Sequence, residues 1–245
     1  MVLPRFYTPD LQPERGTVVL SPDESAHLTR VLRLRVGARL LVFDGRGSQH
    51  LASVASIGKT AVEVNVLEAF PAAAEPRVPI TLAQAVLKGD KMDAVIRDAT
   101  MMGVAAVRPV ITERTVVPRG AAEQPGVQTR WHRIAVASAK QCGRAVVPSI
   151  EPAWTLDALI ADSGPAGARR FLLIEPFVAE QSLPIDAATP ASALILIGPE
   201  GGWAPDEVTR ALAAGFHPLS LGARTLRAES APLAALSVLS WIWKL

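Results

Sequence analysis

The chain has 245 residues, of which 49% are hydrophobic, and its formal net charge is +2. This length suits one large domain or two smaller ones, each with a full core. The single cysteine, Cys142, excludes an internal disulfide, and no apolar run approaches the ~20 residues that cross a bilayer. The first residues lack the apolar segment of a signal peptide. We therefore expect a cytoplasmic protein with no membrane partner.

The four histidines are scattered along the sequence and form no cluster with Cys142. They are His27, His50, His132 and His217. Protein metal sites need several such ligands at close spacing. We therefore predict no metal site.

Positive charge gathers in two parts of the chain. Between His27 and Arg46 there are five arginines and one acid, and between Arg108 and Arg144 seven basic residues accompany two acids. Such clusters are typical of a surface that binds a phosphate backbone. A merely solvated surface has the same composition, so both interpretations stay open for either cluster.

Residues 1–70 have the pattern of a small β-rich unit. Ser21 and Glu24 form a capping box with a proline between them, which predicts a short helix as far as Leu32. A turn signature lies at residues 44–47. The predicted strands cover residues 40–43, 51–54 and 60–67. Short strands joined by tight turns favour a small barrel.

Three prolines mark residues 69–79 as a linker, and we place the domain boundary between residues 72 and 73. From Ile80 onward strands alternate with helices, which predicts an α/β domain with a parallel sheet. Residues 112–129 have the composition of a polar loop. The predicted strands cover residues 80–86, 104–110, 171–174, 193–197 and 219–221. The predicted helices cover residues 92–102, 129–141, 205–214 and 229–243.

The strand at 193–197 leads directly into a glycine-rich loop at 198–203, and a helix follows near Pro205. In an open α/β sheet, ligands bind at the carboxyl ends of the strands. The loop carries Glu200 and lacks the lysine and hydroxyl pair of a phosphate-binding loop. It therefore favours a neutral or cationic ligand. A plain strand-to-helix turn is the alternative interpretation.

A second glycine turn follows the short strand near Leu221, and Arg224 and Arg227 come next. Two turns with bare backbone can enclose one pocket, with Ile197, Leu221 and Leu226 against the faces of a flat heterocycle. The two arginines would then lie at the pocket mouth. A guanidinium group there can hold a phosphate or polarise a carbonyl.

These two segments belong to a set of seven motifs in which the chain resembles the bacterial 16S ribosomal RNA uracil-N3 methyltransferases. That family lies within the SPOUT superfamily of knotted, S-adenosylmethionine-dependent RNA methyltransferases. The resemblance covers nearly the whole chain, and the motifs occur in the family's order. They span residues 27–33, 43–45, 88–92, 113–114, 141–144, 196–202 and 221–229. The chain departs from the usual pattern at Lys140, Cys142, Ala228, Ser230 and Pro232.

The resemblance implies an RNA-binding β-barrel of the PUA type at residues 1–72. It implies a methyltransferase domain at residues 73–245, with a parallel sheet and a trefoil knot. It further implies a homodimer, S-adenosylmethionine as cofactor, and 16S ribosomal RNA or the small ribosomal subunit as partner. The expected reaction is methylation of N3 of a uridine.

The resemblance implies the cofactor-binding residues, and the charge and chemistry of the side chains add the RNA-binding and catalytic candidates. The expected cofactor-binding residues are Glu175, Ile197, Gly198, Pro199, Gly201, Gly202, Leu219, Leu221, Gly222 and Leu226. The expected RNA-binding residues are Arg5, Arg30, Arg33, Lys88, Lys91, Arg114, Gln141, Arg144 and Arg224. Arg30 and Arg33 should lie on one side of the short helix. The expected catalytic residues are Arg227 and Glu200.

Several roles stay open. Arg227 either favours the deprotonated uracil or anchors an adjacent phosphate, and Glu200 either attracts the positive cofactor or caps the helix near Pro205. Cys142 is disfavoured as a nucleophile because methylation at nitrogen needs no covalent adduct. Two other functions fit less well: a ribose 2′-hydroxyl methyltransferase of the same superfamily, and a ribosome-assembly RNA-binding protein without catalysis.

Overall fold

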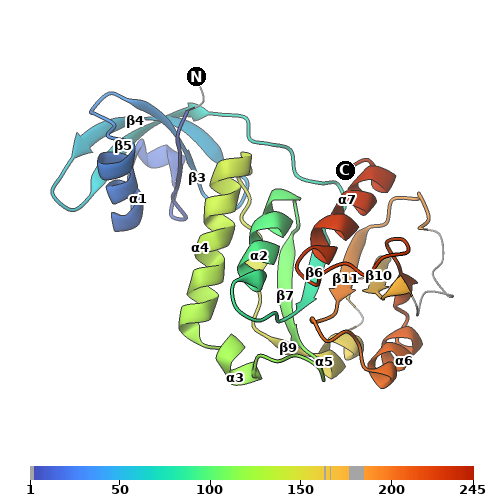
Figure 1. Ribbon diagram of the computed structural model, residues 1–245. Coiled ribbons are helices and arrows are strands. Elements are labelled where there is room, and N and C mark those ends of the chain that lie inside the picture. The colour runs from blue at the N-terminus through green and yellow to red at the C-terminus, as the bar shows by residue number, and fades with distance from the viewer. Residues whose placement is uncertain (1–2, 163, 166, 177–184) are drawn as a thin grey trace. The chain divides into compact units, whose positions relative to one another are not determined.

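The structure is a computed structural model that describes residues 3–162, 164–165, 167–176 and 185–245. The chain forms two compact units (Figure 1). The first contains Met1–Glu75 and Val136–Val147, and the second contains Pro76–Ala135 and Pro148–Leu245. Helix α4 (Pro125–Cys142) therefore begins in the second unit and ends in the first.

The first unit is a five-stranded sheet with two short helical segments. The strands are β1 (Arg5–Tyr7), β2 (Thr17–Val19), β3 (Arg39–Phe43), β4 (Gln49–Ile57) and β5 (Val62–Ala69). Their order across the sheet is β1-β3-β4-β5-β2, and β1 pairs with β3 in parallel. The sequence predicts the three long strands and misses β1 and β2, since three residues are too few to show a period.

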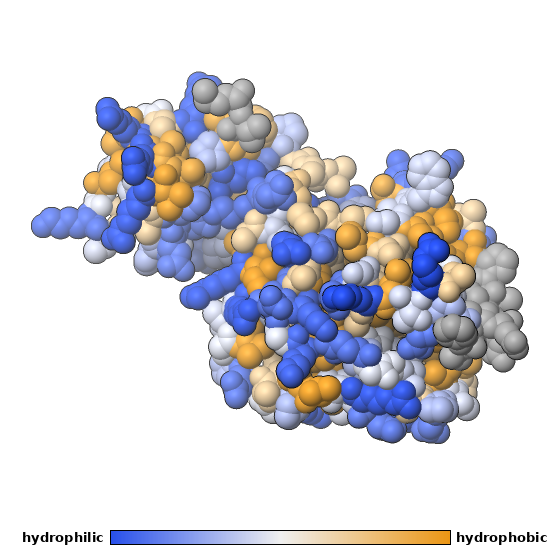
Figure 2. All heavy atoms as spheres, viewed as in Figure 1, coloured by the Kyte–Doolittle hydropathy of each residue, from blue (hydrophilic) through white to orange (hydrophobic). Residues whose placement is uncertain are grey.

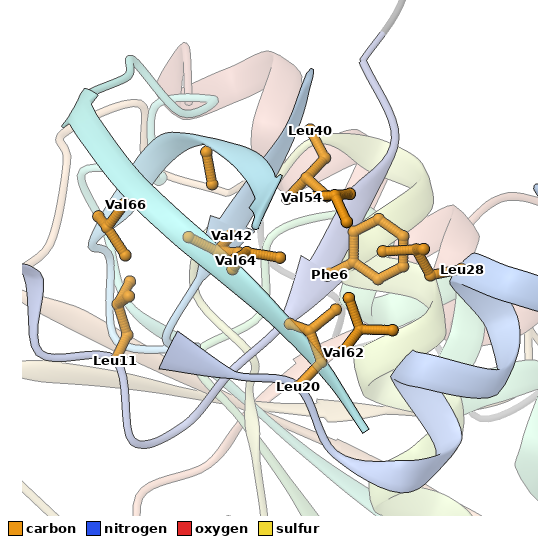
Figure 3. Packing of buried hydrophobic residues seen from close by; sticks show 11 residues of the cluster. Phe6, Leu11, Leu20, Leu28, Leu40, Val42, Val54, Val62, Val64 and Val66 are labelled. Atoms are coloured by element: carbon orange, nitrogen blue, oxygen red, sulfur yellow. The ribbon is translucent and has the colours of Figure 1, made fainter. Parts of the chain in front are cut away.

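The core of the first unit is built from alternate residues of these strands. Val62, Val64 and Val66 of β5 point to the same side, as alternation requires. In Figure 3, Phe6 of β1 lies against Leu28 from the helical segment, so this segment covers the apolar face of the sheet. The unit also holds Phe43 against Ala139 of α4.

Ser21 caps the helical segment as predicted, but the Glu24 side chain binds Lys140 Nζ and does not complete the capping box. Ser21 Oγ accepts a hydrogen bond from the Glu24 amide at 3.3 Å, at the start of α1 (Pro22–Ala26). A π-helical turn continues α1 through His27–Val31. Arg33 lies beyond this turn with a left-handed φ of 52°. The prediction that Arg30 and Arg33 share one side of a helix is therefore wrong, because the helix ends before Arg33.

The second unit is built on a parallel sheet in the order β12-β10-β11-β6-β7-β8, and β9 also pairs with β7. The strands are β6 (Ile80–Ala85), β7 (Ala106–Ile111), β8 (Ser149–Ile150), β9 (Trp154–Thr155), β10 (Ala168–Leu173), β11 (Ser192–Ile197) and β12 (His217–Leu219). The helices are α2 (Lys91–Met101), α3 (Arg119–Ala122), α5 (Leu156–Ala161), α6 (Pro205–Ala213) and α7 (Ala231–Trp243), besides the start of α4. The pairings within this sheet are all parallel among the described strands, as the alternating sequence pattern predicts.

Helices cover both faces of this sheet (Figure 1). Phe171 and Leu172 are consecutive on β10 and so point to opposite faces. Phe171 meets Trp243 of α7 with ring centroids 6.1 Å apart, and α2 contacts α7. Leu172 packs in a cluster with side chains of α5 and α6.

Two predicted boundaries are wrong. Residues 112–129 are not a continuous loop, because α3 lies within them and α4 begins at Pro125. A proline in the first position of a helix loses no hydrogen bond, so the Pro-Gly pair at 125–126 opens the helix instead of preventing it. The last short strand ends at Leu219, which leaves Leu221 in the following turn.

No helix in the described part of the chain is long and apolar enough to cross a lipid bilayer. On the face drawn in Figure 2, hydrophilic side chains gather over the region of the second unit around α2.

Candidate active site

The segments that follow β10, β11 and β12 meet at the carboxyl ends of these strands and line a cavity of about 280 Å³. Both predicted glycine turns line it, one after β11 and one after β12. Its apolar walls come from Leu173, Ile174, Ile197, Leu221 and Leu226. Apolar walls with a few polar groups are typical of a small-molecule site.

The turn after β11 is held in shape by close packing. Trp203 Nε1 donates a hydrogen bond to the carbonyl of Leu173 at 2.8 Å, which ties the turn to the end of β10. A Cβ on Gly198 would come within 3.0 Å of the indole ring. Gly202 has a φ of 69°, and a Cβ there would meet Glu175 Oε1 at 2.5 Å. Only glycine adopts this left-handed φ without strain and leaves room for the Glu175 carboxylate.

Most of the expected cofactor-binding residues line the cavity: Glu175, Ile197, Gly198, Pro199, Gly202, Leu221 and Leu226. The other three do not. Gly201 lies against Arg114, the carbonyl of Leu219 accepts the Ile174 amide at 3.0 Å, and Gly222 lies outside the lining with a φ of 94°.

Sequence reasoning missed several lining residues: Leu173, Ile174, Pro176, Trp203, Ser220, Thr225, Ala228, Glu229 and Ala231. Leu173 and Ile174 directly precede Glu175 at the end of a predicted strand, so the strand end alone could have identified them. Ser220 and Thr225 carry no such signal. They reach the cavity because the chain folds back after β12.

A buried glutamate joins the turn after β11 to the loop after β7. Glu207 is 2% exposed, its Oε2 accepts the Ala204 amide at 3.0 Å, and its Oε1 accepts the Glu113 amide at 2.8 Å. Next to it, Arg114 Nη1 donates to the Gly201 carbonyl at 3.1 Å. Glu207 therefore caps α6, and the interpretation of Glu200 as the cap is wrong.

Glu200 instead pairs with the start of α2. Its Oε1 accepts hydrogen bonds from Lys91 Nζ at 3.0 Å and from the Lys88 amide at 3.3 Å. Burial raises the pKa of this carboxyl. Hydrogen bonds from its own amide, the Lys91 ammonium and the Lys88 amide lower the pKa by more than burial raises it. The net pKa lies below the usual value, so Glu200 is an anion at neutral pH.

Two guanidinium groups stand at the cavity without a side-chain partner in the described part of the chain. Arg224 and Arg227 both line it, both are exposed, and neither side chain makes a hydrogen bond or ion pair with another described residue. Backbone bonds from Ser230 and Ala231 to the Arg227 carbonyl, at 2.9 and 3.0 Å, fix the turn that carries Arg227. Both cations are therefore available to an anionic or carbonyl-bearing ligand.

The expected RNA-binding residues divide into two groups. Arg30, Arg33, Lys88, Arg114, Gln141 and Arg224 are exposed, while Lys91 is half-buried between two carboxylates, Glu200 and Glu229. Arg5 and Arg144 serve the first unit internally, so the structure does not support their expected RNA contacts.

The guanidinium of Arg5 has no donor to spare. Its five N–H groups bond the Gln49 side chain and the carbonyls of Ala139, Lys140 and Arg144, so it caps the end of α4. Arg144 is 4% exposed, and its Nε donates to Glu75 at 3.0 Å. The Arg144 guanidinium is therefore occupied by Glu75, and removing either partner would leave the other charge unpaired.

Among the described residues, no three His, Cys, Asp or Glu side chains gather in a way that could hold a metal ion.

Two known protein families match the chain, one over each part of it. Residues 74–240 match the model of a family described as RNA methyltransferase domain, and residues 20–67 match one described as RNA methyltransferase PUA domain. The chain therefore belongs to this family of RNA methyltransferases.

Two relatives that match nearly the whole chain carry the same name. The ribosomal RNA small subunit methyltransferase E of Synechocystis sp. is 33% identical over 228 residues, which cover 91% of this chain and 72% of that protein. The protein of the same name from Mycobacterium bovis is 31% identical over 250 residues, covering 99% of this chain and 94% of the relative.

Two solved structures share the fold of nearly the whole chain. The crystal structure of a ribosomal RNA small subunit methyltransferase E from Neisseria gonorrhoeae, bound to S-adenosyl methionine, has a TM-score of 0.87 and 30% identity, and covers 99% of this chain and 98% of that one. A putative methyltransferase from Legionella pneumophila, in complex with bound cofactor SAM, has a TM-score of 0.85 and 31% identity, with 98% of each chain covered.

The two lysines beside Glu200 make one prediction. In Lys91→Met the pKa of Glu200 should rise, because the mutation removes an ammonium group that lowers it while burial remains. Lys88→Met is the matched control, since Lys88 meets Glu200 through its backbone amide alone. NMR titration of the Glu200 carboxyl carbon measures both. A Glu200 pKa that Lys91→Met leaves unchanged would contradict the electrostatic account.

The lowered pKa of Glu200 also determines how the free energy of unfolding changes with pH. Because folding lowers the pKa of Glu200, this group stabilises the fold at neutral pH, and the contribution is lost as pH falls through the folded pKa. In Lys91→Met the free energy of unfolding should therefore fall less between neutral and acid pH than in wild type. In Lys88→Met it should fall as much as in wild type.

Proposed function

We propose that this RNA methyltransferase transfers a methyl group from S-adenosylmethionine to N3 of a uridine in 16S ribosomal RNA. The observation that carries the proposal is the cavity itself, in which two bare-backbone turns meet apolar walls and exposed arginines. Relatives at about 30% identity are named for methylating small-subunit ribosomal RNA, and two structures of this fold hold the cofactor.

The residues present fit this cofactor. Leu173, Ile197 and Leu226 would pack against the adenine faces, and the backbone of the turn after β11 would bond its edge. The cofactor is positively charged at sulfur and at its amino group, and Glu175 and Glu200 bring negative charge to the same cavity. When bound, the cofactor supplies an activated methyl group, and the protein supplies position.

Arg227 is the proposed catalytic cation. A neutral uracil nitrogen is a poor nucleophile, and a guanidinium next to a ring carbonyl favours the deprotonated form. Arg227 lines the cavity and has no partner among the described residues, so its donors can reach that carbonyl. Glu200 acts beside it by holding Lys91 and by keeping negative charge near the cofactor.

RNA binding is proposed for the exposed cations of each unit. In the second unit Lys88, Arg114 and Arg224 are exposed, and Arg114 is bonded directly to the turn after β11. In the first unit Arg30, Arg33, Arg35 and Arg39 are exposed within ten residues and make no ion pair with described residues. Such residues contact phosphates, so affinity for RNA should fall steeply with salt.

We also propose a homodimer, a trefoil knot and a cytoplasmic location. The dimer is supported by α7, which exposes Leu233, Val238 and Trp241, the last at 85%. The knot is supported by the likeness of the whole fold to the cofactor-bound structures and by the return of the chain along the cavity after β12. An experimental structure with cofactor tests both by its backbone path and its partner contacts.

The function is tested by the product. Purified enzyme, S-adenosylmethionine and unmodified 16S ribosomal RNA or small subunits should yield 3-methyluridine, identified by nucleoside mass analysis against a standard. A methylated ribose would instead assign the 2′-hydroxyl activity. Cofactor-dependent methylation of neither atom, with RNA still bound, would identify an assembly protein without catalysis.

Arg227→Ala tests the catalytic cation. With saturating RNA and cofactor, we expect kcat to fall about 100-fold, the range for removing one donor that stabilises developing charge. Cofactor affinity by calorimetry should stay within a few-fold. Arg97→Ala is the control, because Arg97 is exposed on α2 and, among the residues that the structure describes, pairs with its neighbour Asp98 alone. Near-normal turnover in Arg227→Ala would remove Arg227 from the chemistry.

A further inference from the structure

We propose that Glu229 is the group that accepts the N3 proton of the target uridine during methyl transfer. This inference rests on the proposed function, because it assigns a role within that reaction. It begins from a chemical requirement: the substrate nitrogen carries a proton that the methyl group must replace. Some acceptor within hydrogen-bond reach has to take it.

Three carboxylates line the cavity, and one of them, Glu200, is already hydrogen-bonded. Glu200 Oε1 accepts hydrogen bonds from Lys91 and from the Lys88 amide. Glu175 places Oε1 against the backbone of Gly202, so closely that a Cβ there would lie 2.5 Å from it. Glu200 therefore pairs the turn after β11 with α2, and Glu175 lies packed against the backbone of that turn.

Glu229 differs from the other two. Its Oε2 is buried and makes no hydrogen bond with any described residue. The Lys91 ammonium lies 3.9 Å away, which is beyond hydrogen-bond length. Buried polar atoms are almost always paired, and an unpaired one needs an explanation such as a catalytic role. A donor that arrives with a ligand supplies that explanation.

The surrounding charge indicates which ligand brings the donor. Glu229 stands two residues after Arg227 in the turn that also carries Arg224, and Lys91 faces it. Arg224 and Arg227 line the cavity without an ion-pair partner among the described residues, and their charges disfavour the positively charged end of the cofactor here. They suit an RNA nucleotide, with its phosphates and its carbonyl oxygens. The N–H between the two carbonyls of uracil is then the donor that Oε2 lacks.

The step is balanced. N3 bonds to the methyl carbon, the carbon–sulfur bond breaks with its electron pair left on sulfur, and the N3 proton passes to Glu229 Oε2. The electrons of the N–H bond stay on nitrogen, and the product ring is neutral. Glu229 then releases the proton to water, so no further reactant is required.

Glu229→Gln keeps the size of the side chain and removes the proton acceptor. At neutral pH we expect kcat to fall at least 100-fold. The RNA affinity without cofactor, by fluorescence anisotropy, and the affinity for S-adenosylhomocysteine, by calorimetry, should stay within about threefold. As pH rises, the uracil N–H ionises without help, so the rate of Glu229→Gln should climb toward that of wild type.

The conservative variant Glu229→Asp should retain part of the rate at neutral pH, and the neighbour control Ser230→Ala should behave as wild type, since the Ser230 side chain makes no cap hydrogen bond. Normal turnover of Glu229→Gln, loss of cofactor affinity in place of rate, or a rate deficit that does not close with pH would each overturn the proposal. If wild-type enzyme itself makes no 3-methyluridine, the proposed function fails instead, and the two results are distinct.

Discussion

The site depends on one tightly folded turn, residues 198–203 between β11 and α6. Its shape is imposed by contacts on three sides: the Trp203 indole bonds the end of β10, Gly202 lies against Glu175, and Gly201 lies against Arg114. Side chains at these glycines would push the neighbouring elements apart. Because the turn has no side chains on that side, its backbone can approach a ligand closely.

The same turn and the start of α6 are bonded to two other parts of the site, the loop after β7 and the start of α2. Glu207 caps α6 and also holds the Glu113 amide, so the loop that carries Arg114 moves with the turn. Glu200 holds Lys91 at the start of α2, and Lys91 in turn faces Glu229. The cavity thus gathers three acids and three cations whose charges nearly balance. An electrically mixed cavity suits a cationic cofactor next to an anionic substrate, which a phosphate-binding loop would not.

Much of this site could be predicted from the sequence, because local signals encode it. Two strands that end in glycine turns place those turns at one edge of a parallel sheet, and the cavity is there. The helix cap at Ser21 and the linker before Ile80 are local in the same way. The resemblance to a known family supplied the cofactor and substrate, which periodicity alone does not.

The errors concern residues whose roles depend on distant partners. Arg5 and Arg144 look like exposed RNA ligands in the sequence, yet Gln49 and Glu75 engage them, and neither partner is near in sequence. Lys91 is neutralised by two acids from other loops. The start of α4 was missed because proline and glycine favour both loops and helix starts. Glu229 lies within a recognised motif, but only the three-dimensional structure reveals its unpaired oxygen.

The central claim is that the backbone of the 198–203 turn binds the cofactor, and calorimetric titration of S-adenosylmethionine tests it most directly. Wild type should bind one molecule per chain. Gly202→Ala should bind at least tenfold more weakly, because its Cβ would collide with Glu175 inside the cavity. Gly215→Ala carries a similar backbone strain at φ 85° with open space around it, and should bind as wild type does. Equal affinity in Gly202→Ala and wild type would contradict the account.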